Sequence, residues 1–415
     1  MNKRKIINDP VYGFVNINFD IIFDLMEHPY LQRLRRIRQL GLTHYVYPGA
    51  SHSRFQHALG TTYLMDAAIK LLRSKGIDIS LEEEEAVTIA IFLHDIGHGP
   101  FSHTLENTIV NGISHEVISY LLMQELNTQF NGRLSLALSI FNNQYHRKFL
   151  HELVSSQLDL DRMDYLTRDS FFTGVVEGTV GFDRIIYMLN VFNDKLVVDS
   201  KGIYSIEKFL ISRRLMYWQV YLHKTVIAAD NVLMRILERA KLLSTQGFHV
   251  FATPALEYFL RSDINAAKLE LMDHPERLNM LTQFISIDDN DIISAIKVWM
   301  NSSDGLLSML SKSFIYRKLN RIEIFDEEIP AMDVMNQKNI FLDKNPTIKD
   351  YVDSFVYTGI LENKTYNPKT ENISILNKKN QLIDVSDASD IFRFNEQFAV
   401  SRKYFLSYPK NAITF

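Results

Sequence analysis

The alternation of apolar and polar positions predicts a chain that is helical over most of its length. Residues 5–19 instead predict short strands around a Pro-Gly turn. Ser80 and Glu83 predict a capping box at the start of one apolar helix. A hairpin is predicted over 192–204, and 206–243 is predicted as one long helix. The other predicted helices cover about 23–40, 52–72, 81–95, 102–110, 115–127, 133–141, 146–156 and 157–170.

The pattern changes after residue 320, where short strand-like segments stand among Asn, Lys and Asp. These segments are RIEIF, KNIFL, SFVYTGI and QLIDV. We therefore expect a mainly α fold, a helical bundle with short N-terminal strands and a smaller α+β C-terminal lobe. The expected parts are a core at 1–240 that includes the N-terminal hairpin, a helical extension packed on it at 241–320, and the lobe at 321–415.

Composition is that of a globular protein, since 46% of the 415 residues are hydrophobic and 23% are charged. A net charge of −4 does not require nucleic acid as a bulk partner. The absence of cysteine excludes disulfides and thiolate ligands, so any metal must be bound by His, Asp or Glu. The start of the chain lacks the apolar stretch of a signal peptide, and the most apolar run, about 86–93, is too short to span a bilayer. We expect a cytoplasmic protein without membrane contact.

Histidines cluster in the first third of the chain, where seven of the 13 lie between His44 and His115. An isolated histidine is usually an ordinary core or surface residue, but His94 and Asp95 are adjacent at the end of an apolar helix. A carboxylate buried there costs several kcal/mol unless a cation compensates it. His57 can supply a second imidazole and Asp161 a second carboxylate. Two imidazoles and two carboxylates with open positions indicate a Lewis-acid metal site.

Three motifs carry a resemblance to a known family: PGASHSRFQHALG (48–60), FLHDIGHGPFSH (92–103) and LDRMDYLTRD (160–169). Together with LQRLRRIRQLG (31–41) and YLHK (221–224), they resemble the deoxynucleoside triphosphate triphosphohydrolases of the HD superfamily over about residues 5–230. The nearest branch is that of the SAM-and-HD-domain triphosphohydrolase and its bacterial relatives. The resemblance implies an HD-domain core. It also implies a divalent ion (Mn, Fe, Mg, Co or Ni) on His57, His94, Asp95 and Asp161.

The implied reaction is attack of water at the α-phosphorus of a dNTP, which releases a deoxynucleoside and inorganic triphosphate. The resemblance places three arginines, otherwise ordinary salt-bridge partners, against the triphosphate: Arg54, Arg162 and Arg213. It assigns sugar recognition to Gln39, Tyr165, Asp169 and Tyr221, although the tyrosines also suit ordinary core packing. The proton for the leaving oxygen is implied to come from His103, assisted by His115 and His98. Glu106 stands where the family commonly carries Asp as the supporting acid.

The resemblance also implies a regulatory nucleotide bound between subunits of a homo-oligomer, a dimer or tetramer. The matching positions are Lys5, Asn8, Gln32, Arg35, His223 and Lys224. Glu27 stands where guanine-reading members carry Asp. The arginine cluster at 33–38 would otherwise be a solvated helical face.

Two alternatives stay open. One is another HD-type nucleotide phosphatase or phosphodiesterase, which the metal set alone cannot distinguish. The other is a nucleotide-sensing or single-strand nucleic-acid-binding protein without turnover, for which the arginine cluster and the 12% aromatic content leave room. The GHGPFSH and DRMDYLTRD contexts favour the triphosphohydrolase, and the presence of all four ligand types argues against an inactive site.

Overall fold

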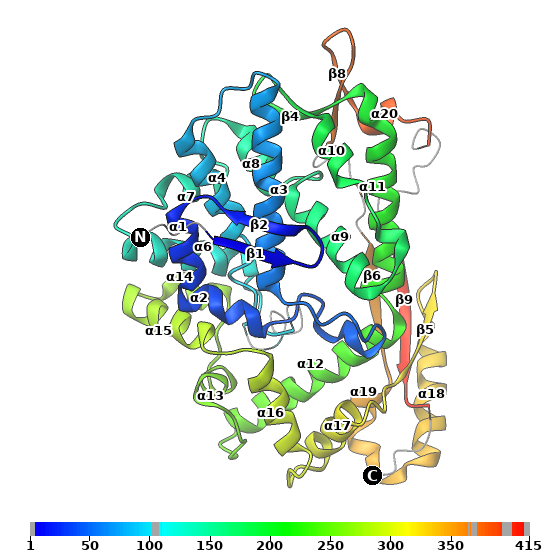
Figure 1. Cartoon of the computed structure of the whole chain (residues 1–415). Helices are drawn as coiled ribbons and strands as arrows, with labels where there is room; N and C mark the ends of the chain where they lie inside the picture. Colours follow the sequence, from blue (N-terminus) through cyan, green and yellow to red (C-terminus); the bar gives the residue numbers. More distant parts are fainter. Residues whose placement is uncertain are drawn as a thin grey trace.

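Helices make up most of the chain, as predicted (Figure 1). The computed structural model describes residues 5–101, 108, 110–363, 366, 372–391 and 401–410. Its α-helices are α1 (Asp20–Glu27), α2 (Pro29–Gln32), α3 (Arg54–Ser74), α4 (Leu81–Leu93), α6 (His115–Gln129), α7 (Ser135–Phe141), α8 (Lys148–Val154), α9 (Leu160–Thr173), α10 (Phe182–Met188), α11 (Ile203–Met216), α12 (Lys224–Thr245), α13 (Pro254–Arg261), α14 (Ala266–Leu271), α15 (His274–Ile285), α16 (Asp289–Trp299), α17 (Gly305–Ile315), α18 (Ala331–Lys344), α19 (Val352–Phe355) and α20 (Val385–Ala388). Short 3-10 turns connect several of them: η1 (Arg33–Arg36), η2 (Gly41–Tyr45), η3 (Val176–Gly178), η4 (Ser200–Gly202) and η6 (Pro346–Tyr351).

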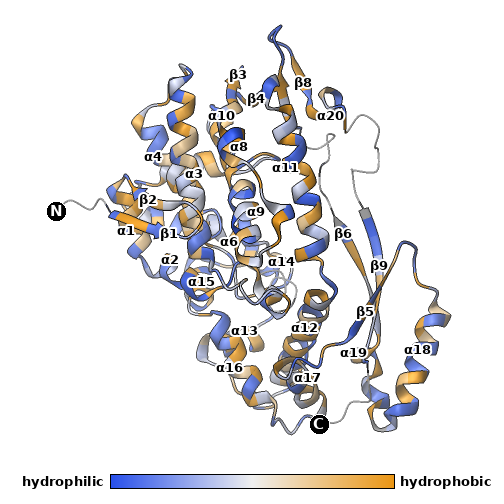
Figure 2. Cartoon of the chain, turned by 45° about the vertical axis from the view of Figure 1, so that its right-hand side comes forward, coloured by the Kyte–Doolittle hydropathy of each residue, from blue (hydrophilic) through white to orange (hydrophobic). Residues whose placement is uncertain are grey.

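The apolar helix α4 lies at the centre of the body. It begins with the predicted capping box, in which the Ser80 side chain accepts from the backbone N–H of Glu83 at 3.0 Å and the Glu83 carboxylate accepts from that of Ser80 at 2.9 Å. From Ala86 to Leu93 every residue of α4 is buried, so the helix must be surrounded by other elements. Helices α3, α7 and α8 surround it. Helices farther from this centre carry both hydrophobic and hydrophilic faces (Figure 2).

The strands form three small sheets. β1 (Lys5–Asp9) and β2 (Gly13–Ile17) make the predicted N-terminal hairpin. A second sheet has the order β3 (Leu189–Phe192), β4 (Lys195–Asp199), β7 (Ser374–Leu376), β8 (Leu382–Asp384), and a third has the order β5 (Arg321–Phe325), β9 (Ser401–Tyr408), β6 (Tyr357–Asn363). The β4–β7 pair is parallel and the other pairs are antiparallel. Residues far along the chain therefore extend a sheet that begins in the body.

The predicted helix at 23–40 is broken into α1, α2 and η1. Pro29 restricts the preceding residue, so His28 is extended (φ −68°, ψ 139°) and the helix restarts with Pro29 in its first turn. Ile37 is also extended, which ends η1. Arg33 is fully buried here and donates to the carbonyl oxygens of His98 at 2.7 Å and Ile287 at 3.1 Å. Arg33 of the arginine cluster therefore links buried segments by hydrogen bonds and does not lie on a solvated helical face.

The prediction of a single helix over 206–243 is also wrong. A π-helical turn at Tyr217–Tyr221 follows α11, and His223 is extended (φ −64°, ψ 134°) before α12 begins. The His223 ring accepts from the backbone N–H of Thr225 at 3.1 Å, so His223 is the N-cap of a new helix. The apolar periodicity continues through this break, which is why the pattern did not show it.

Two other segments differ from the prediction. The hairpin lies at 189–199 and not at 192–204, because Asn193 and Asp194, with φ of 50° and 62°, form its two-residue turn. GIYSI lies instead in η4 and the start of α11. The predicted strand KNIFL lies within α18, and SFVYTGI becomes a strand only from Tyr357 onward. The predicted helix at 102–110 falls largely outside the described residues, and α12 crosses the predicted part boundary at residue 240.

Among the helices of the described residues, none combines the length and the apolar character that crossing a membrane requires.

Candidate active site

Three helices bring the four predicted metal-ligating side chains together. His57 lies in the first turn of α3, His94 and Asp95 directly follow α4, and Asp161 lies in the first turn of α9. His57 Nε2 is 3.0 Å from Asp161 Oδ1, and His94 Nε2 is 3.4 Å from the same oxygen. Asp95 places its oxygens 3.3 Å from His94 Nε2 and 3.7 Å from His57 Nε2. Adjacent ligand atoms of an octahedral divalent ion are about 3 Å apart, so this donor set fits such an ion.

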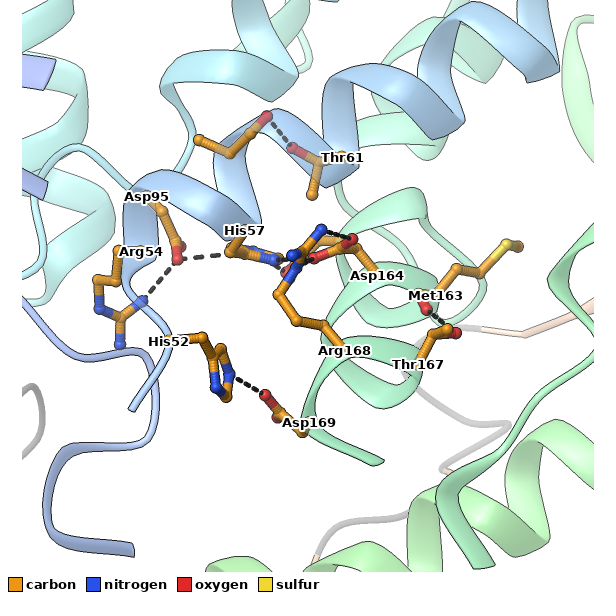
Figure 3. A network of polar contacts seen from close by, with 12 residues as sticks. His52, Arg54, His57, Thr61, Asp95, Met163, Asp164, Thr167, Arg168 and Asp169 are labelled. Atoms are coloured by element: carbon orange, nitrogen blue, oxygen red, sulfur yellow. Dashed lines mark hydrogen bonds and ion pairs between the residues drawn. The ribbon is translucent and has the colours of Figure 1, made fainter. Parts of the chain in front are cut away.

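Hydrogen bonds fix which nitrogen of each imidazole faces the centre. His94 Nδ1 lies 2.6 Å from the carbonyl oxygen of Ile91, which can only accept, so Nδ1 carries the proton. His57 Nδ1 lies 2.6 Å from Asp164 Oδ2 and donates to that carboxylate (Figure 3). Both Nε2 atoms then present lone pairs, and they lie only 3.4 Å apart. Two lone pairs and two carboxylates around one point attract positive charge, which either protons or a metal ion can supply.

The electrostatics of the centre favour positive charge. Burial alone lowers the pKa of His57, but hydrogen bonds with Asp161 and Asp164 raise it to about 10. Burial alone raises the pKa of Asp95, yet His94, His98 and Arg54 hold it well below its usual range. A metal ion bound here must therefore displace protons, so metal affinity falls as the pH falls.

A cavity of about 1200 Å³ opens directly above this centre. Asp95, His94 and Asp161 lie on its wall, while His57 is buried behind them. The structure brings all the described residues of the predicted substrate and catalytic sets to the same cavity: Gln39, Arg54, His98, His115, Arg162, Tyr165, Asp169, Arg213 and Tyr221.

The side of the cavity near the metal-ligating residues is cationic. Arg54 donates to Asp95 at 2.5 Å, Arg162 forms an ion pair with Asp159, and Arg213 donates to Gln157 at 2.9 Å. These three guanidinium groups give the cavity positive charge suited to phosphate oxygens.

His98 and His115 form a stacked pair beside the metal-ligating group, with ring centroids 3.7 Å apart. His98 Nε2 lies 3.3 Å from Asp95 Oδ1, so Asp95, His98 and His115 make a second group of clustered ligand atoms. Burial and the nearby charge of Arg54 lower the pKa of His98 well below its usual value. His98 is therefore a neutral imidazole at physiological pH, able to accept or relay a proton.

A second polar group, around Asp169, lies farther along α9. Asp169 is buried, accepts from the Tyr221 hydroxyl at 2.8 Å and lies 2.8 Å from His52 Nε2. The Tyr165 and Tyr221 rings meet edge to face, with centroids 6.2 Å apart. Gln39 Oε1 is buried and has no hydrogen-bond partner among the described residues. An acceptor without a hydrogen-bond partner on a cavity wall is suited to accept from a hydroxyl group of a ligand.

For some of the predicted site residues, the structure does not test the predicted role. His103 and Glu106 lie outside the described residues. Of the predicted regulatory set, Lys5, Asn8 and Lys224 are exposed. Gln32 accepts from Arg35 at 2.9 Å. Binding of a regulatory nucleotide at these residues remains a prediction.

The sequence alone did not identify several residues that shape the site. Asp164 and Arg168 stand in the LDRMDYLTRD motif and support His57, and their spacing from Asp161 by three and seven residues is the signal that could have revealed them. His52 and Tyr217 were also missed. So was Asp230 on α12, which lines the far part of the cavity and whose pKa burial raises to about 7.

Comparison with known proteins assigns the family. The HD domain matches residues 54–169, and the HD associated region matches residues 180–249. The uncharacterized protein YwfO of Bacillus subtilis is 31% identical over 428 residues, which cover all of this chain and 94% of that protein. The crystal structure of a phosphohydrolase from Bacteroides thetaiotaomicron is 49% identical, with a TM-score of 0.92 over 98% of this chain and all of that one.

A further relative carries a named activity. The human deoxynucleoside triphosphate triphosphohydrolase SAMHD1 is 28% identical over 277 residues, which cover 56% of this chain and 44% of that protein. Its Dictyostelium discoideum homolog is 32% identical over 54% of this chain and 46% of its own length. The chain belongs to the HD-domain phosphohydrolases. Within them it falls in the group related to the deoxynucleoside triphosphate triphosphohydrolases.

Loss of a metal-ligating side chain should abolish metal binding without unfolding the chain. A ligand that binds only the folded state stabilises it by about 2.7 kcal/mol at 100 times its Kd. We expect Mn²⁺ to raise the Tm of the wild type, and this rise to vanish in His57→Ala and Asp161→Ala. Glu270→Gln, which changes an exposed acid on α14, is the control and should keep the full rise. An undiminished Mn²⁺ effect in Asp161→Ala would contradict the assignment.

Asp230 should make stability depend on pH. Its carboxyl has a pKa of about 7 in the folded chain and about 3.9 when unfolded, so the folded state holds an extra proton between these values. The contribution of this group to stability is complete below about pH 4 and is lost as the pH rises through 7. Asp230→Asn should therefore have a Tm about 2 °C or more above wild type at pH 8.5, and this difference should disappear towards pH 4. Asp183→Asn, an exposed control, should show no such trend.

Proposed function

We propose that the chain is a metal-dependent dNTP triphosphohydrolase. The observation that carries the proposal is the convergence of His57, His94, Asp95 and Asp161 beside a cavity that is also lined by Arg54, Arg162, Arg213 and the polar group around Asp169. A divalent ion held by these four side chains would supply a Lewis acid for a phosphoryl oxygen and make a water molecule more acidic. The triphosphohydrolase activity for which the SAMHD1 relatives are named supports the choice of substrate.

The residues of the chain would bind and orient the triphosphate. Arg54, Arg162 and Arg213 would neutralise its oxygens, which is the largest requirement for attack on an anionic phosphate. The water oxygen forms a bond to the α-phosphorus, the bond from this phosphorus to O5′ breaks, and the products are a deoxynucleoside and inorganic triphosphate. Neutral His98 and its stacked partner His115 are suited to move a proton at this end of the cavity. His103 remains the predicted donor to O5′, supported by Glu106.

We infer that the second group, Asp95 with His98 and His115, faces the substrate and does not hold another protein-bound ion. The guanidinium group of Arg54 forms an ion pair with Asp95 at 2.5 Å. A second ion here would be repelled both by Arg54 and by the ion held by the first group, whereas phosphate oxygens would be attracted.

Binding of single-stranded nucleic acid is the less favoured alternative. Arg33 is buried, and Arg36 and Arg38 form ion pairs with Asp288 and Asp289. These pairings reduce the positive charge that the cluster at 33–38 offers to a phosphate backbone.

The product identifies the reaction. Wild-type protein is incubated with each dNTP and rNTP, alone and in pairs, with Mn²⁺, Mg²⁺, Fe²⁺ or Co²⁺, and inorganic triphosphate is measured by ³¹P NMR. We expect triphosphate from dNTPs and none from the Asp161→Ala control. Activity that appears only with nucleotide mixtures would establish activation by a second nucleotide. Orthophosphate or a nucleoside monophosphate as product would refute the proposal in favour of another HD-type phosphohydrolase.

Tyr221 tests sugar recognition. If its ring fills the space beside the 2′ carbon, Tyr221→Ala should reduce the ratio of kcat/KM for dATP over ATP by about tenfold or more, which corresponds to about 1.4 kcal/mol. Tyr221→Phe keeps the ring and loses only the hydroxyl bond to Asp169, so it should retain most of the discrimination. Equal ratios in wild type and Tyr221→Ala would remove this residue from the sugar site.

A further inference from the structure

A buried chain of charged side chains runs from the N-terminal hairpin to the metal-ligating group. Asp9 is the last residue of β1, and its carboxylate accepts from Arg168 Nη1 at 2.8 Å and from Arg168 Nη2 at 3.3 Å. Arg168 also donates to both oxygens of Asp164, at 2.9 and 3.1 Å. Asp164 in turn accepts from His57 Nδ1 at 2.6 Å. Figure 3 shows the inner part of this chain, with Arg168 and Asp164 lying against His57.

The four members are shielded from solvent. His57, Asp164 and Arg168 are 0% exposed and Asp9 is 4% exposed. One guanidinium group is therefore shared by two carboxylates in a place where water does not screen them. Removing either carboxylate changes the charge that the other feels through Arg168.

The packing around the chain leaves little room for another arrangement. A Cβ at Gly60 on α3 would lie 1.9 Å from Asp164 Oδ1 and 2.2 Å from Arg168 Nη2, so a larger residue there would displace both groups. On the other side, the Tyr12 ring lies 5.5 Å from the Arg168 guanidinium carbon and stacks on Tyr63 at 4.8 Å. Side chains held on all sides transmit a displacement instead of absorbing it.

Asp9 also fixes the turn of its own hairpin. Its Oδ1 accepts from the backbone N–H groups of Val11 at 2.9 Å and Tyr12 at 3.1 Å. The hairpin is otherwise a surface element, in which the Ile6 and Phe14 side chains are about two-thirds exposed. A single carboxylate thus joins the turn of a surface hairpin to the support of a metal-ligating imidazole.

We propose that Asp9 is a positioning residue for His57, acting through Arg168 and Asp164, and that the β1–β2 hairpin and the metal centre are thereby coupled. The inference rests on the proposed metal centre. The hydrogen bond from Asp164 orients the His57 ring and increases the basicity of Nε2, and Asp9 sets how much of the Arg168 charge Asp164 receives. The coupling works in both directions, so a metal ion at His57 also steadies the hairpin turn.

Metal affinity is the first measurement, made by titrating Mn²⁺ into folded protein by calorimetry. Loss of the support that contacts a metal-ligating histidine typically weakens binding about 10–100-fold, which we expect for Asp164→Asn. For Asp9→Asn and Asp9→Ala we expect a smaller loss of about 3–10-fold, since Asp9 acts one step farther away. Asn18→Ala is the matched control, because Asn18 joins the same N-terminal segment to α3 through Asp66 at 2.9 Å and does not contact the chain of charges. It should bind Mn²⁺ like the wild type.

Hydrogen exchange gives a second readout that needs only the wild-type chain and the conservative Asn variant. We expect Mn²⁺ to slow exchange of the Val11 and Tyr12 amides in the wild type, and this effect to be lost in Asp9→Asn. Unchanged exchange of these amides in the Mn²⁺-bound wild type, or unchanged Mn²⁺ affinity in a folded Asp9→Ala, would overturn the inference and leave the metal centre intact. A wild type that binds no Mn²⁺ would overturn the metal centre itself.

Discussion

The convergence of four hydrogen-bond acceptors on one buried point is the constraint on which this structure depends. The Nδ1–H groups of His57 and His94 donate hydrogen bonds away from this point, to Asp164 and to the carbonyl of Ile91. Their Nε2 lone pairs therefore face each other beside the carboxylates of Asp95 and Asp161. Such a group is unstable without positive charge, because every member repels the others and water cannot reach His57. The protein therefore has to hold three helix termini rigidly, and α4 and α9 do this by each packing on α3.

Helix α9 shows how one element supplies both the support and the reacting surface. Asp161, Tyr165 and Asp169 follow one another by four residues and line the cavity, so two carboxylates and a ring lie on one face of the helix. Asp164 and Arg168 have the same spacing and face the interior, where they hold His57 from behind. An i,i+4 repeat of polar residues on two faces is unusual for a buried helix, since each charge needs its own partner. The partners of Asp164 and Arg168 come from α3 and from the N-terminal hairpin, whereas those of Asp169 are His52 and Tyr221.

The sequence predicted most of this arrangement where local chemistry decides it. The interactions between near neighbours determine the Ser80–Glu83 capping box and the hairpin at 5–17. The motif segments could be interpreted because their His, Asp and Arg residues suit only a few functions. The predictions were wrong where contacts between residues distant in the sequence determine the local structure. Tyr217–Tyr221 and His223 break a helix whose apolar pattern is continuous, and the KNIFL segment is amphipathic enough to be either strand or helix until its packing on the C-terminal sheet selects a helix. The burial of Arg33 could not be predicted, because no local pattern shows that the carbonyl groups of His98 and Ile287 will accept its hydrogen bonds.

The same distinction between local and distant contacts separates chemistry from substrate selection. The four predicted metal-ligating residues and two of the three arginines expected at the triphosphate lie within residues 54–169, where the HD domain matches. The far wall of the cavity is built from α12 and β6, which includes Tyr357 to Leu361, almost two hundred residues after the last motif. Asp230 belongs to this wall, and a carboxyl with a pKa of about 7 offers a hydrogen-bond donor or only acceptors according to small changes in its surroundings. The motifs can therefore indicate phosphohydrolase chemistry, while selection among substrates depends on contacts that only the assembled fold creates.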